Sequence, residues 1–484
     1  MLRVRLDAGR VKKEALINLI NFSKDNNLKL LITARAGLEL HNILPEKILD
    51  TYYRVKELGF NTHQSLTDNV RAIVLDPYDG IAKDSKIDCF RVLEQIKKEL
   101  IDNSKYFGML PRKFNTAFIG RVTPLINFWG NDLVFALSKK DNRFGFNIYI
   151  GGKNSEVAKD IDIFIEPKDA KELFFAILDT FLEHGLKESR AKTRIFHLIE
   201  KIGIKSLRDL ISKRVGCKLE SSGELLVKSS KYKIYTKLKD NTFAKVLDCN
   251  YGEINLNSAI DKIKDFKDIR VGVDQSLHAI GINKKEDEDT KSSLITACAG
   301  ARYCPLSLWD IKRDIKELNL EIFKKEGINI GFSGCLKGCG RHHHNHIGLV
   351  GLRSNMFGKT QKAIRVFIGS SESKNRAPAR LLYYAVPVNR AKELFKTIID
   401  EYKTKDYKDF DEFNNHLNQF STELLQLWFI LRQLIKLDKE LIKLFHTKDS
   451  EDSLLKEIKK LDVYPKKDEL YENINILSHK LWDY

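Results

Sequence analysis

Four of the seven cysteines occur as two close pairs, a spacing that can hold a metal centre. Cys298 and Cys304 enclose five residues, Cys335 and Cys339 enclose three, and thirty residues separate the two pairs. Zinc-binding pairs usually enclose two to four residues, so the first pair is wider than is usual for zinc. Four thiolates are the usual ligands of a cubane iron–sulfur cluster. The pattern therefore predicts a metal centre and favours a cluster over zinc.

Four histidines directly follow the second cysteine pair: His342, His343, His344 and His346. They precede "IGLVG" (347–351), an apolar run that predicts a buried strand. Neighbouring side chains diverge in a helix or a strand, so three consecutive histidines cannot all face one metal. We expect these histidines at the surface or beside a cofactor, with proton donation by one of them as the alternative.

The chain around these residues predicts a mixture of helices and strands. Apolar residues at helical spacing mark residues 13–26, and a strand pattern follows at 28–33. The segment "AKELFFAILDTFLEHGL" (170–186) predicts an amphipathic helix that ends at a glycine. The segment "AKELFKTIIDEY" (391–402) predicts a second helix and repeats the first five letters. Helices and strands mixed in this way indicate the α+β class.

The length and charge of the chain limit the kinds of protein it can be. With 484 residues, 43% of them hydrophobic, it can form a large core divided over two to four domains. Its formal net charge of +17 is partly that of solvated lysines and favours an anionic partner, substrate or cofactor. It contains no recognised nucleic-acid-binding signature, so we expect no nucleic acid partner.

The remaining sequence features predict a soluble cytoplasmic protein. The first residues, "MLRVRLDAGR", are charged from the third position and do not resemble a signal peptide. The longest apolar run, residues 424–431, is too short to span a bilayer. An odd number of cysteines argues against a disulfide framework. The isolated Cys89, Cys217 and Cys249 are expected to be buried as small apolar residues.

The spacing C-x5-C, about thirty residues, then C-x3-C followed by Gly-Arg resembles that of the sirohaem-dependent nitrite and sulfite reductases. The resemblance implies that Cys298, Cys304, Cys335 and Cys339 bind a [4Fe–4S] cluster. It also implies that Cys339 bridges the cluster to the iron of sirohaem.

Residues 1–400 resemble the family in the order that its domains require. The resembling segments are 1–9, 28–43, 65–81, 110–115 and 145–152. An internal repeat supports the same plan, because residues 28–43 can be aligned with residues 267–282, within the segment 266–282, at an offset of 239.

The resemblance implies a pseudo-twofold repeat of a ferredoxin-like unit and an α/β lobe that binds sirohaem and the cluster, followed by a helical extension. The domains that we expect are a first ferredoxin-like half-domain (1–57), a first reductase lobe (58–215), a second ferredoxin-like half-domain (216–287), a second lobe with the cysteines (288–403) and a C-terminal extension (404–484). The pattern of residues 413–445 predicts that this extension contains two or three helices.

Several polar residues match the positions that bind substrate or sirohaem in the family. Arg35 and Arg71 match its two arginines, which can orient an anion while pairing with carboxylates. Lys113 matches a lysine that donates protons. Arg112 and Gln275 match positions that contact sirohaem.

Three positions bear on how the site would differ from that of relatives. Asn115 stands where sulfite reductases have a second lysine and looks like the nitrite reductase version. A neutral amide suits a monoanion such as nitrite, whereas the dianion sulfite gains from a further cation. Lys337 lies between the second pair of cysteines, where relatives usually have Pro-Asn, and is expected to pair with a sirohaem carboxylate or to raise the cluster potential. Ala36 replaces a common glutamine.

These resemblances imply an enzyme that reduces nitrite to ammonium with six electrons. No G-x-G-x-x-G fingerprint follows a strand, so we expect electrons from a separate carrier, ferredoxin or flavodoxin, drawn to a basic surface. The alternatives are sulfite reduction with the same cofactors, a precorrin-3B synthase-like hydroxylase and a non-catalytic iron–sulfur protein. Arg35, Arg71 and Lys113 argue against the hydroxylase. We expect a monomer that does not bind membranes.

Overall fold

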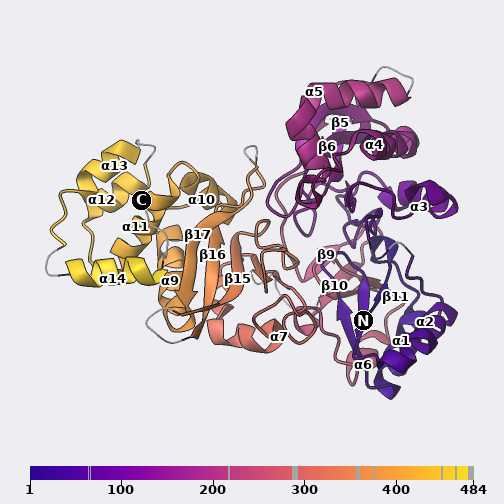
Figure 1. The fold of residues 1–484 in the computed structure, drawn as a ribbon, viewed down its shortest axis with the longest axis horizontal. Helices are drawn as coiled ribbons and strands as arrows, with labels where there is room; N and C mark the ends of the chain where they lie inside the picture. Colours follow the sequence, from indigo (N-terminus) through magenta and orange to yellow (C-terminus); the bar gives the residue numbers. More distant parts are fainter. Residues whose placement is uncertain are drawn as a thin grey trace. The chain divides into compact units, whose positions relative to one another are not determined.

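The computed structural model describes residues 1–63, 65, 67–215, 219–285, 293–355, 360–373, 376–447, 451–463 and 466–477. The prediction for Cys217 lies outside these residues. The chain forms two compact units, Met1–Thr290 and Lys291–Tyr484, and each is described by itself (Figure 1).

Unit 1 begins with a small sheet covered by a helix. Its strands are β1 (Leu2–Val4), β2 (Lys29–Ile32) and β3 (Leu38–His41), in the spatial order β1-β3-β2. Helix α1 (Lys13–Asp25) lies between β1 and β2 in the chain and buries one apolar stripe, as its periodicity predicts. Helix α2 (Ile48–Glu57) follows β3.

A second sheet of unit 1 repeats this arrangement. Strands β10 (Phe243–Leu247), β11 (Asp268–Val271) and β12 (Leu277–Ile282) pair in the order β11-β12-β10-β9, where β9 is Tyr235–Lys237, and α6 (Ala259–Ile263) lies between β10 and β11 in the chain. The register of the hairpin is repeated as well. Lys29 pairs with His41 and Asp268 pairs with Ile280, so both members of the pair are shifted by 239 residues.

The hairpin turns also repeat their unusual backbone conformations. Ala36 (φ 54°) and its counterpart Gln275 (φ 65°) both have positive φ, as do Asn42 and Gly281. Such values are uncommon in residues other than glycine. The internal repeat inferred from the sequence is therefore present in the structure.

Each of the two small sheets closes an edge of the other. Arg10 bridges to Arg270 on the edge strand β11, and Glu253 bridges to Leu31 on the edge strand β2. Glycine makes these close approaches sterically possible. A Cβ atom on Gly9 would lie 1.8 Å from the carbonyl oxygen of Val271.

We expect Gly9→Ala to lower the free energy of unfolding of unit 1 by roughly 2–5 kcal/mol, because it adds overlap to an unfavourable positive φ. Gly59→Ala is the matched control, since Gly59 also has positive φ but a Cβ there meets nothing within 4 Å. It should cost only about 1–2 kcal/mol. Thermal unfolding of both variants measures the difference, and equal losses would contradict the steric explanation.

The larger lobe of unit 1 is a sheet flanked by helices. Its strands, in the order β4-β5-β6-β7, are β4 (Thr116–Ile119), β5 (Leu133–Lys140), β6 (Arg143–Ile150) and β7 (Lys159–Ile165), and β8 (Glu224–Leu225) pairs with β5. Helices α4 (Ala170–His184) and α5 (Ile195–Val215) lie beside β5 and β6, and α3 (Cys89–Asp102) packs on α4 (Figure 1). Leucine, isoleucine, valine and phenylalanine side chains fill the core, in which Phe118 stacks on Phe135. Cys89 and Cys249 are buried, as predicted.

Unit 2 contains the corresponding sheet of the second lobe. Its strands, in the order β13-β14-β15-β16-β17, are β13 (Ile295–Ala297), β14 (Ile330–Ser333), β15 (Ile347–Ser354), β16 (Gln361–Ile368) and β17 (Arg380–Pro387). The first three strands are parallel and the others antiparallel. Helices α7 (Ile311–Asp314) and α8 (Glu321–Lys324) are short, and α9 (Val388–Tyr402) packs on β16 and β17. The predicted strand at 347–351 and helix at 391–402 are both present.

The parallel strand pairs of the two lobes have equivalent registers. Thr116 of β4 pairs with Leu133 of β5, and Ile330 of β14 pairs with Ile347 of β15, so each position is shifted by 214 residues. The loop after β4 therefore corresponds to the loop after β14. The second of these loops carries Cys335 and Cys339.

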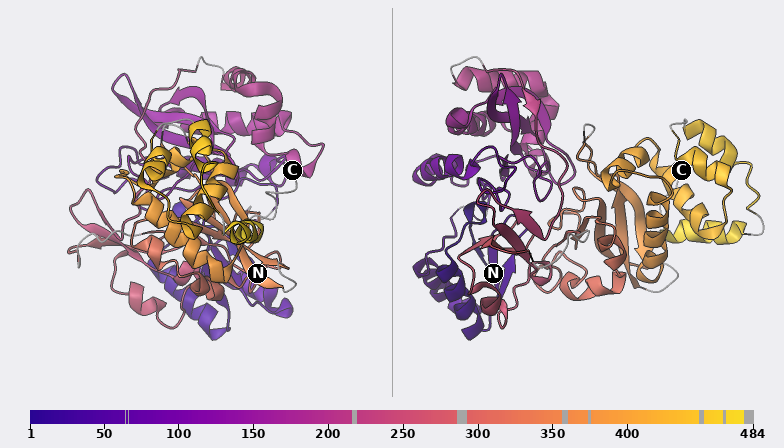
Figure 2. Two further views of the ribbon diagram at one scale, coloured as in Figure 1. Left: turned by 90° about the vertical axis from the view of Figure 1, so that its left-hand side faces the viewer. Right: turned by 180° about the vertical axis from the view of Figure 1, so that it is seen from behind.

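The prediction of two or three helices for the C-terminal extension was wrong, because five helices are described there. They are α10 (Phe410–Leu417), α11 (Thr422–Leu434), α12 (Lys439–Phe445), α13 (Glu451–Ile458) and α14 (Lys467–Leu477). Side-chain caps divide the long apolar pattern, since Asp409, Ser421 and Asp438 each accept a hydrogen bond from the first turn of the following helix. Helices α11 and α14 pack on β17 (Figure 2).

A buried carboxylate joins this extension to the rest of unit 2. Glu401, at the end of α9, lies 2.6 Å from Arg432 Nε and 2.6 Å from His446 Nε2.

No helix in the described ranges is both long and apolar enough to cross a bilayer.

Candidate functional site

In unit 1 the backbone places Arg71 beside the segment that carries the other predicted cations. Val70 forms a parallel bridge with Phe114, and the Arg71 amide donates to the Phe114 carbonyl over 2.9 Å. Arg112, Lys113 and Asn115 therefore lie next to Arg71 in space, although about forty residues separate them in the chain.

Arg35 joins the same group from the turn between β2 and β3. Its Nη2 donates to the carbonyl of Ala72 over 2.6 Å, and its Nη1 donates to Asn131 Oδ1 over 2.9 Å. Because Ala72 follows Arg71 directly, the guanidinium of Arg35 lies beside the backbone that carries the second arginine. The structure thus gathers Arg35, Arg71 and the 112–115 segment into one basic region, which we call the cation face.

Arg71 remains charged in this region despite its partial burial. Its Nη groups donate to the carbonyls of Ser65 and Thr67, and its buried Nε has no partner in the described residues. Burial lowers the pKa of Arg71 to about 10, and the nearby Arg3 and Arg112 act in the same direction. The guanidinium is still protonated near neutral pH and can attract an anion.

Two carboxylates that the sequence did not single out hold this region together. Asp68 accepts from Arg112 Nη1 over 3.3 Å and from the Lys113 amide over 3.2 Å. Asp132, which is fully buried, accepts from the Asn115 amide over 2.8 Å. No local motif marks either role, because each carboxylate acts on residues distant in the chain.

Gln275 occupies the turn of the second hairpin, at the position equivalent to Ala36. Its side chain is 5% exposed, and its Nε2 donates to the Ile32 carbonyl over 3.2 Å. The repeat thus brings Gln275 close to the strand that leads to Arg35, and its amide supports that strand in the structure.

In unit 2 the first cysteine of the predicted ligand set meets the loop of the second pair. Cys298 follows β13, and its backbone amide donates to the Phe332 carbonyl over 3.0 Å. The Gly334 amide donates to Cys298 Sγ over 3.1 Å. Burial raises the pKa of the Cys298 thiol to about 11, and the nearby Cys339 adds to this shift.

A turn that surrounds Cys304 brings this cysteine close to the loop that carries Cys335 and Cys339. Its amide donates to the Gly300 carbonyl over 2.9 Å, and its carbonyl accepts from the Ser307 amide over 3.2 Å. A Cβ atom on Gly334 would lie 1.9 Å from Ser307 Oγ, so the two cysteine loops are in close contact there. All four cysteines therefore lie at the carboxyl ends of the parallel strands β13 and β14.

The first lobe shows which side chains meet at the equivalent positions. Arg121 corresponds to Cys335 through the 214-residue offset, and Asp76 corresponds to Cys298 through the strand bridges. Arg121 Nη1 and Asp76 Oδ1 are 3.0 Å apart and form a buried ion pair. The fold therefore brings these two positions together in both lobes, and only the second lobe has thiols there.

The described residues contain no group of three His, Cys, Asp or Glu side chains placed to hold one metal ion. In a cubane each thiolate binds a different iron, so the four ligands stand farther apart than ligands of one ion. The amide hydrogen bond to Cys298 Sγ is of the kind that tunes cluster potentials. This donor set fits a cluster.

Two other features of this loop bear on a second cofactor. Cys339 is the exposed member of the four cysteines, whereas Cys298 is buried and the other two are intermediate. Lys337 and Leu336 are also exposed at the tip of the loop. The exposed sulfur and the lysine are thus accessible to a ligand outside the loop.

The histidines connect the cysteine loop to three other segments. His342 Nδ1 lies 2.9 Å from Ser333 Oγ, His343 Nδ1 donates to the Ala379 carbonyl over 2.6 Å, and His346 Nδ1 accepts from the Asn329 amide over 3.1 Å. His342 is fully buried and His344 is 5% exposed. His342 and His344 therefore point into the protein, so a surface position is wrong for these two, and a position beside a cofactor stays a prediction.

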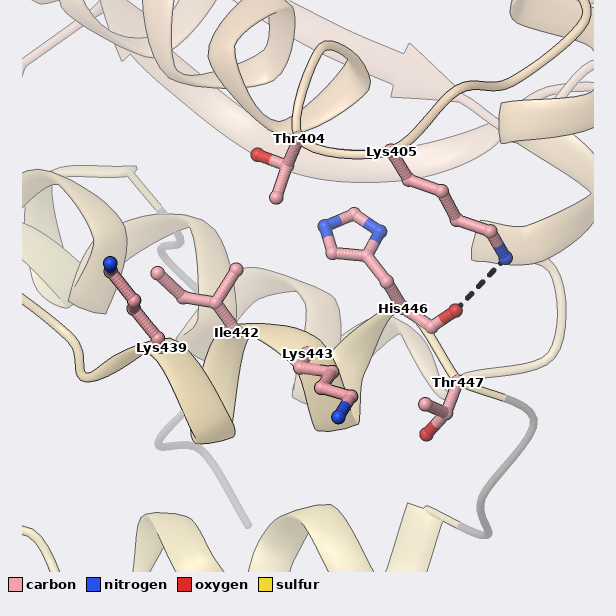
Figure 3. A pocket seen from close by; sticks show the side chains of 7 residues that line it. All are labelled: Thr404, Lys405, Lys439, Ile442, Lys443, His446 and Thr447. Atoms are coloured by element: carbon pink, nitrogen blue, oxygen red, sulfur yellow. Dashed lines mark hydrogen bonds between the residues drawn. The ribbon is translucent and has the colours of Figure 1, made fainter.

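A separate hollow of about 750 Å³ lies among the C-terminal helices of unit 2 (Figure 3). It is lined by Thr404, Lys405, Lys439, Ile442, Lys443, His446 and Thr447. Lys405 donates to the carbonyl of His446 across its rim (Figure 3). None of the residues predicted for cofactor or substrate binding lines it.

Comparison with known proteins finds similarity to nitrite and sulfite reductases. The profile of the family "Nitrite and sulphite reductase 4Fe-4S domain" matches residues 66–219. A ferredoxin–nitrite reductase of Leptolyngbya laminosa is 25% identical over 83% of this chain and 86% of its own length. The sulfite reductase [NADPH] haemoprotein beta-component of Zymomonas mobilis is 24% identical over 72% of this chain and 73% of its own length.

The chain is thus similar to nitrite and sulfite reductases over most of its length. The matched span contains Arg71, Arg112, Lys113 and Asn115, and the four clustered cysteines lie beyond it. The Mycobacterium tuberculosis NirA protein has the same fold, with a TM-score of 0.75 at 20% identity over 87% of this chain and 84% of the NirA chain. The predicted α+β fold of this reductase family is confirmed.

Proposed function

We propose that the chain is a sirohaem- and [4Fe–4S]-dependent reductase that converts nitrite to ammonium and two waters with six electrons and eight protons. The observation that carries this proposal is the gathering of four cysteines at the ends of β13 and β14. The cation face of unit 1 and the relatives named as ferredoxin–nitrite reductases support it.

Cys298, Cys304, Cys335 and Cys339 would hold the cluster, and the exposed Cys339 would also ligate the sirohaem iron. When bound, the two cofactors would pass electrons from the separate carrier to the substrate. Lys337 and Arg112 would pair with sirohaem carboxylates, and the carbonyl-bound Gln275 would support the turn of Arg35.

Arg35 and Arg71 would bind the substrate anion. Both are held by hydrogen bonds to backbone carbonyls, which fix the guanidinium groups before the substrate arrives. Lys113 would deliver protons to the substrate oxygen and nitrogen atoms. Asp68 accepts from its amide and so holds its backbone in place.

Asn115 favours nitrite over sulfite. Its backbone amide is anchored to Asp132, so the side chain starts from a fixed point next to Lys113. An uncharged amide can donate a hydrogen bond to a monoanion, whereas a second lysine would stabilise a dianion further. Sulfite reduction remains the second candidate, because a sulfite reductase haemoprotein is among the relatives.

The absorption spectrum of the purified protein tests the cofactors. We expect a Soret band and a red-region chlorin band in addition to cluster absorption. A cluster spectrum alone, from a host that makes sirohaem, would contradict the proposal and favour a precorrin-3B synthase-like or electron-carrier protein. Ammonium and sulfide formation with reduced ferredoxin then separates nitrite from sulfite reduction.

We expect Asn115→Lys to shift the preference toward sulfite by about tenfold, since 1.4 kcal/mol of added attraction for a dianion is tenfold in kcat/KM. The ratio of kcat/KM for the two anions is the measurement. Asn115→Gln keeps the amide and serves as the control that should leave the ratio nearly unchanged. A shift of the same size in both variants would assign the effect to packing.

The natural donor, compartment and domain limits are part of the same proposal. The net charge of +17 supports docking of an acidic ferredoxin, with flavodoxin as the alternative. We place the enzyme in the cytoplasm as a monomer. We divide it into segments 1–57, 58–215, 216–287, 288–403 and 404–484, the last being the helical extension.

A further inference from the structure

The loop that carries Cys335 and Cys339 is closed at its base by one serine. Ser333, the last residue of β14, is 1% exposed. Its Oγ accepts from the Gly340 amide over 3.0 Å and lies 2.9 Å from His342 Nδ1. Both contacts connect the start of the loop with its end, so hydrogen bonds close the loop that contains both cysteines.

His342 is held in place by packing as well as by this contact. Its ring lies 4.8 Å from the Phe367 ring on β16 and 4.4 Å from the His343 ring, centre to centre. Burial lowers the pKa of His342 to about 3, so the ring is neutral near neutral pH. A neutral imidazole has one donor and one acceptor nitrogen, and a hydroxyl can pair with either.

The two ring nitrogens have very different surroundings. Nδ1 contacts Ser333, whereas the buried Nε2 of His342 has no hydrogen-bond partner in the described part of the chain. An unsatisfied buried nitrogen costs free energy, and an apolar side chain of similar shape would avoid that cost. The hydrogen bond between Nδ1 and Ser333 Oγ therefore explains why a histidine, and not an apolar residue, occupies this position.

We propose that the Ser333–His342 hydrogen bond fixes the C-x3-C loop in the conformation that binds the cluster, so that His342 is a positioning residue. The inference rests on the proposed function for the identity of the cluster. The contact itself lies wholly within unit 2. Partners of this kind that orient metal ligands typically change metal retention by about 10–100-fold when removed.

Two substitutions of His342 separate the hydrogen bond from packing. His342→Asn places an amide where Nδ1 lies, and His342→Gln places it near Nε2 instead. Ser333→Ala removes the contact from the other side. We expect cluster loss to a chelator, followed by absorbance, to be about 10–100-fold faster in His342→Gln and Ser333→Ala than in wild type. His342→Asn should stay within a few-fold of wild type.

Amide exchange at Gly340 in the cluster-free protein provides a second measurement. We expect about tenfold faster exchange in His342→Gln and Ser333→Ala, with rescue in His342→Asn, since opening must break the bond to Ser333. Wild-type behaviour of all three folded variants would overturn the proposal. Equal increases in cluster loss and in Gly340 exchange for His342→Asn and His342→Gln would assign His342 a packing role and would also overturn the proposal. A wild-type protein that takes up no cluster would contradict the proposed function, and the exchange rates would still report on the contact.

Discussion

Cys339→Ser is expected to abolish nitrite reduction, with kcat lowered by more than about 100-fold, which is the upper range for loss of a mere supporting partner. In the proposed enzyme this sulfur serves both the cluster and the sirohaem iron, so one substitution removes the path between them. Cys339 is also the exposed cysteine of the four, and replacing it should not disturb a packed core. The measurements are the ammonium-forming rate, iron content per chain and the chlorin band in the red region.

Cys249→Ala is the matched control for this experiment. Cys249 is 9% exposed in unit 1, and its sulfur donates to the Leu247 carbonyl outside the cysteine cluster. We expect the control to keep its iron, its spectrum and its rate. Retention of the chlorin band and the full rate by Cys339→Ser would exclude the bridging role.

Lys113→Met is expected to lower kcat for nitrite by about 10²–10⁴-fold, the usual contribution of a positioned proton donor. Methionine keeps most of the aliphatic stem and removes only the ammonium group. The Asp68 contact is to the backbone amide of Lys113, so the local fold should survive the change. The effect should fall mainly on kcat, because in the proposed enzyme Arg35 and Arg71 would still bind the anion.

Lys98→Met provides the control for lost surface charge, since Lys98 is exposed on α3 of the same unit. Its kcat should stay within about twofold of wild type, because an exposed charge contributes little. A Lys113→Met enzyme with normal kcat and raised KM would show that the ammonium group binds substrate without delivering protons. Equal losses in both variants would indicate a general effect of charge.

The sequence predicted most of the elements that position the site. The apolar pattern of residues 13–26 predicted α1. The weak repeat at an offset of 239 corresponds in the structure to two hairpins with the same register. Such features are readable because periodicity and turn chemistry are local. The grouping of Arg35, Arg71 and the 112–115 segment followed from the family resemblance, and the roles of these residues remain predictions.

Contacts between distant residues could not be predicted in this way. Nothing local marks Asp76 and Arg121 as a buried pair at positions equivalent to two cysteines. The helices of the extension are a different case, because the caps Asp409, Ser421 and Asp438 were visible in the sequence. The prediction rested on the continuous apolar pattern across 413–445 alone, and such a pattern does not show where one helix ends and the next begins.

The reciprocal edges of the two small sheets have a consequence for the newly made chain. The edge of β2 is covered by Glu253 and Ile254, more than two hundred residues downstream. At 5–20 residues per second, the ribosome needs roughly 10–45 s to reach them after β2 is made. Throughout that interval the amino-terminal hairpin presents unpaired backbone groups to its surroundings. Protection by chaperones during translation would therefore matter most for the part of the enzyme that is synthesised first.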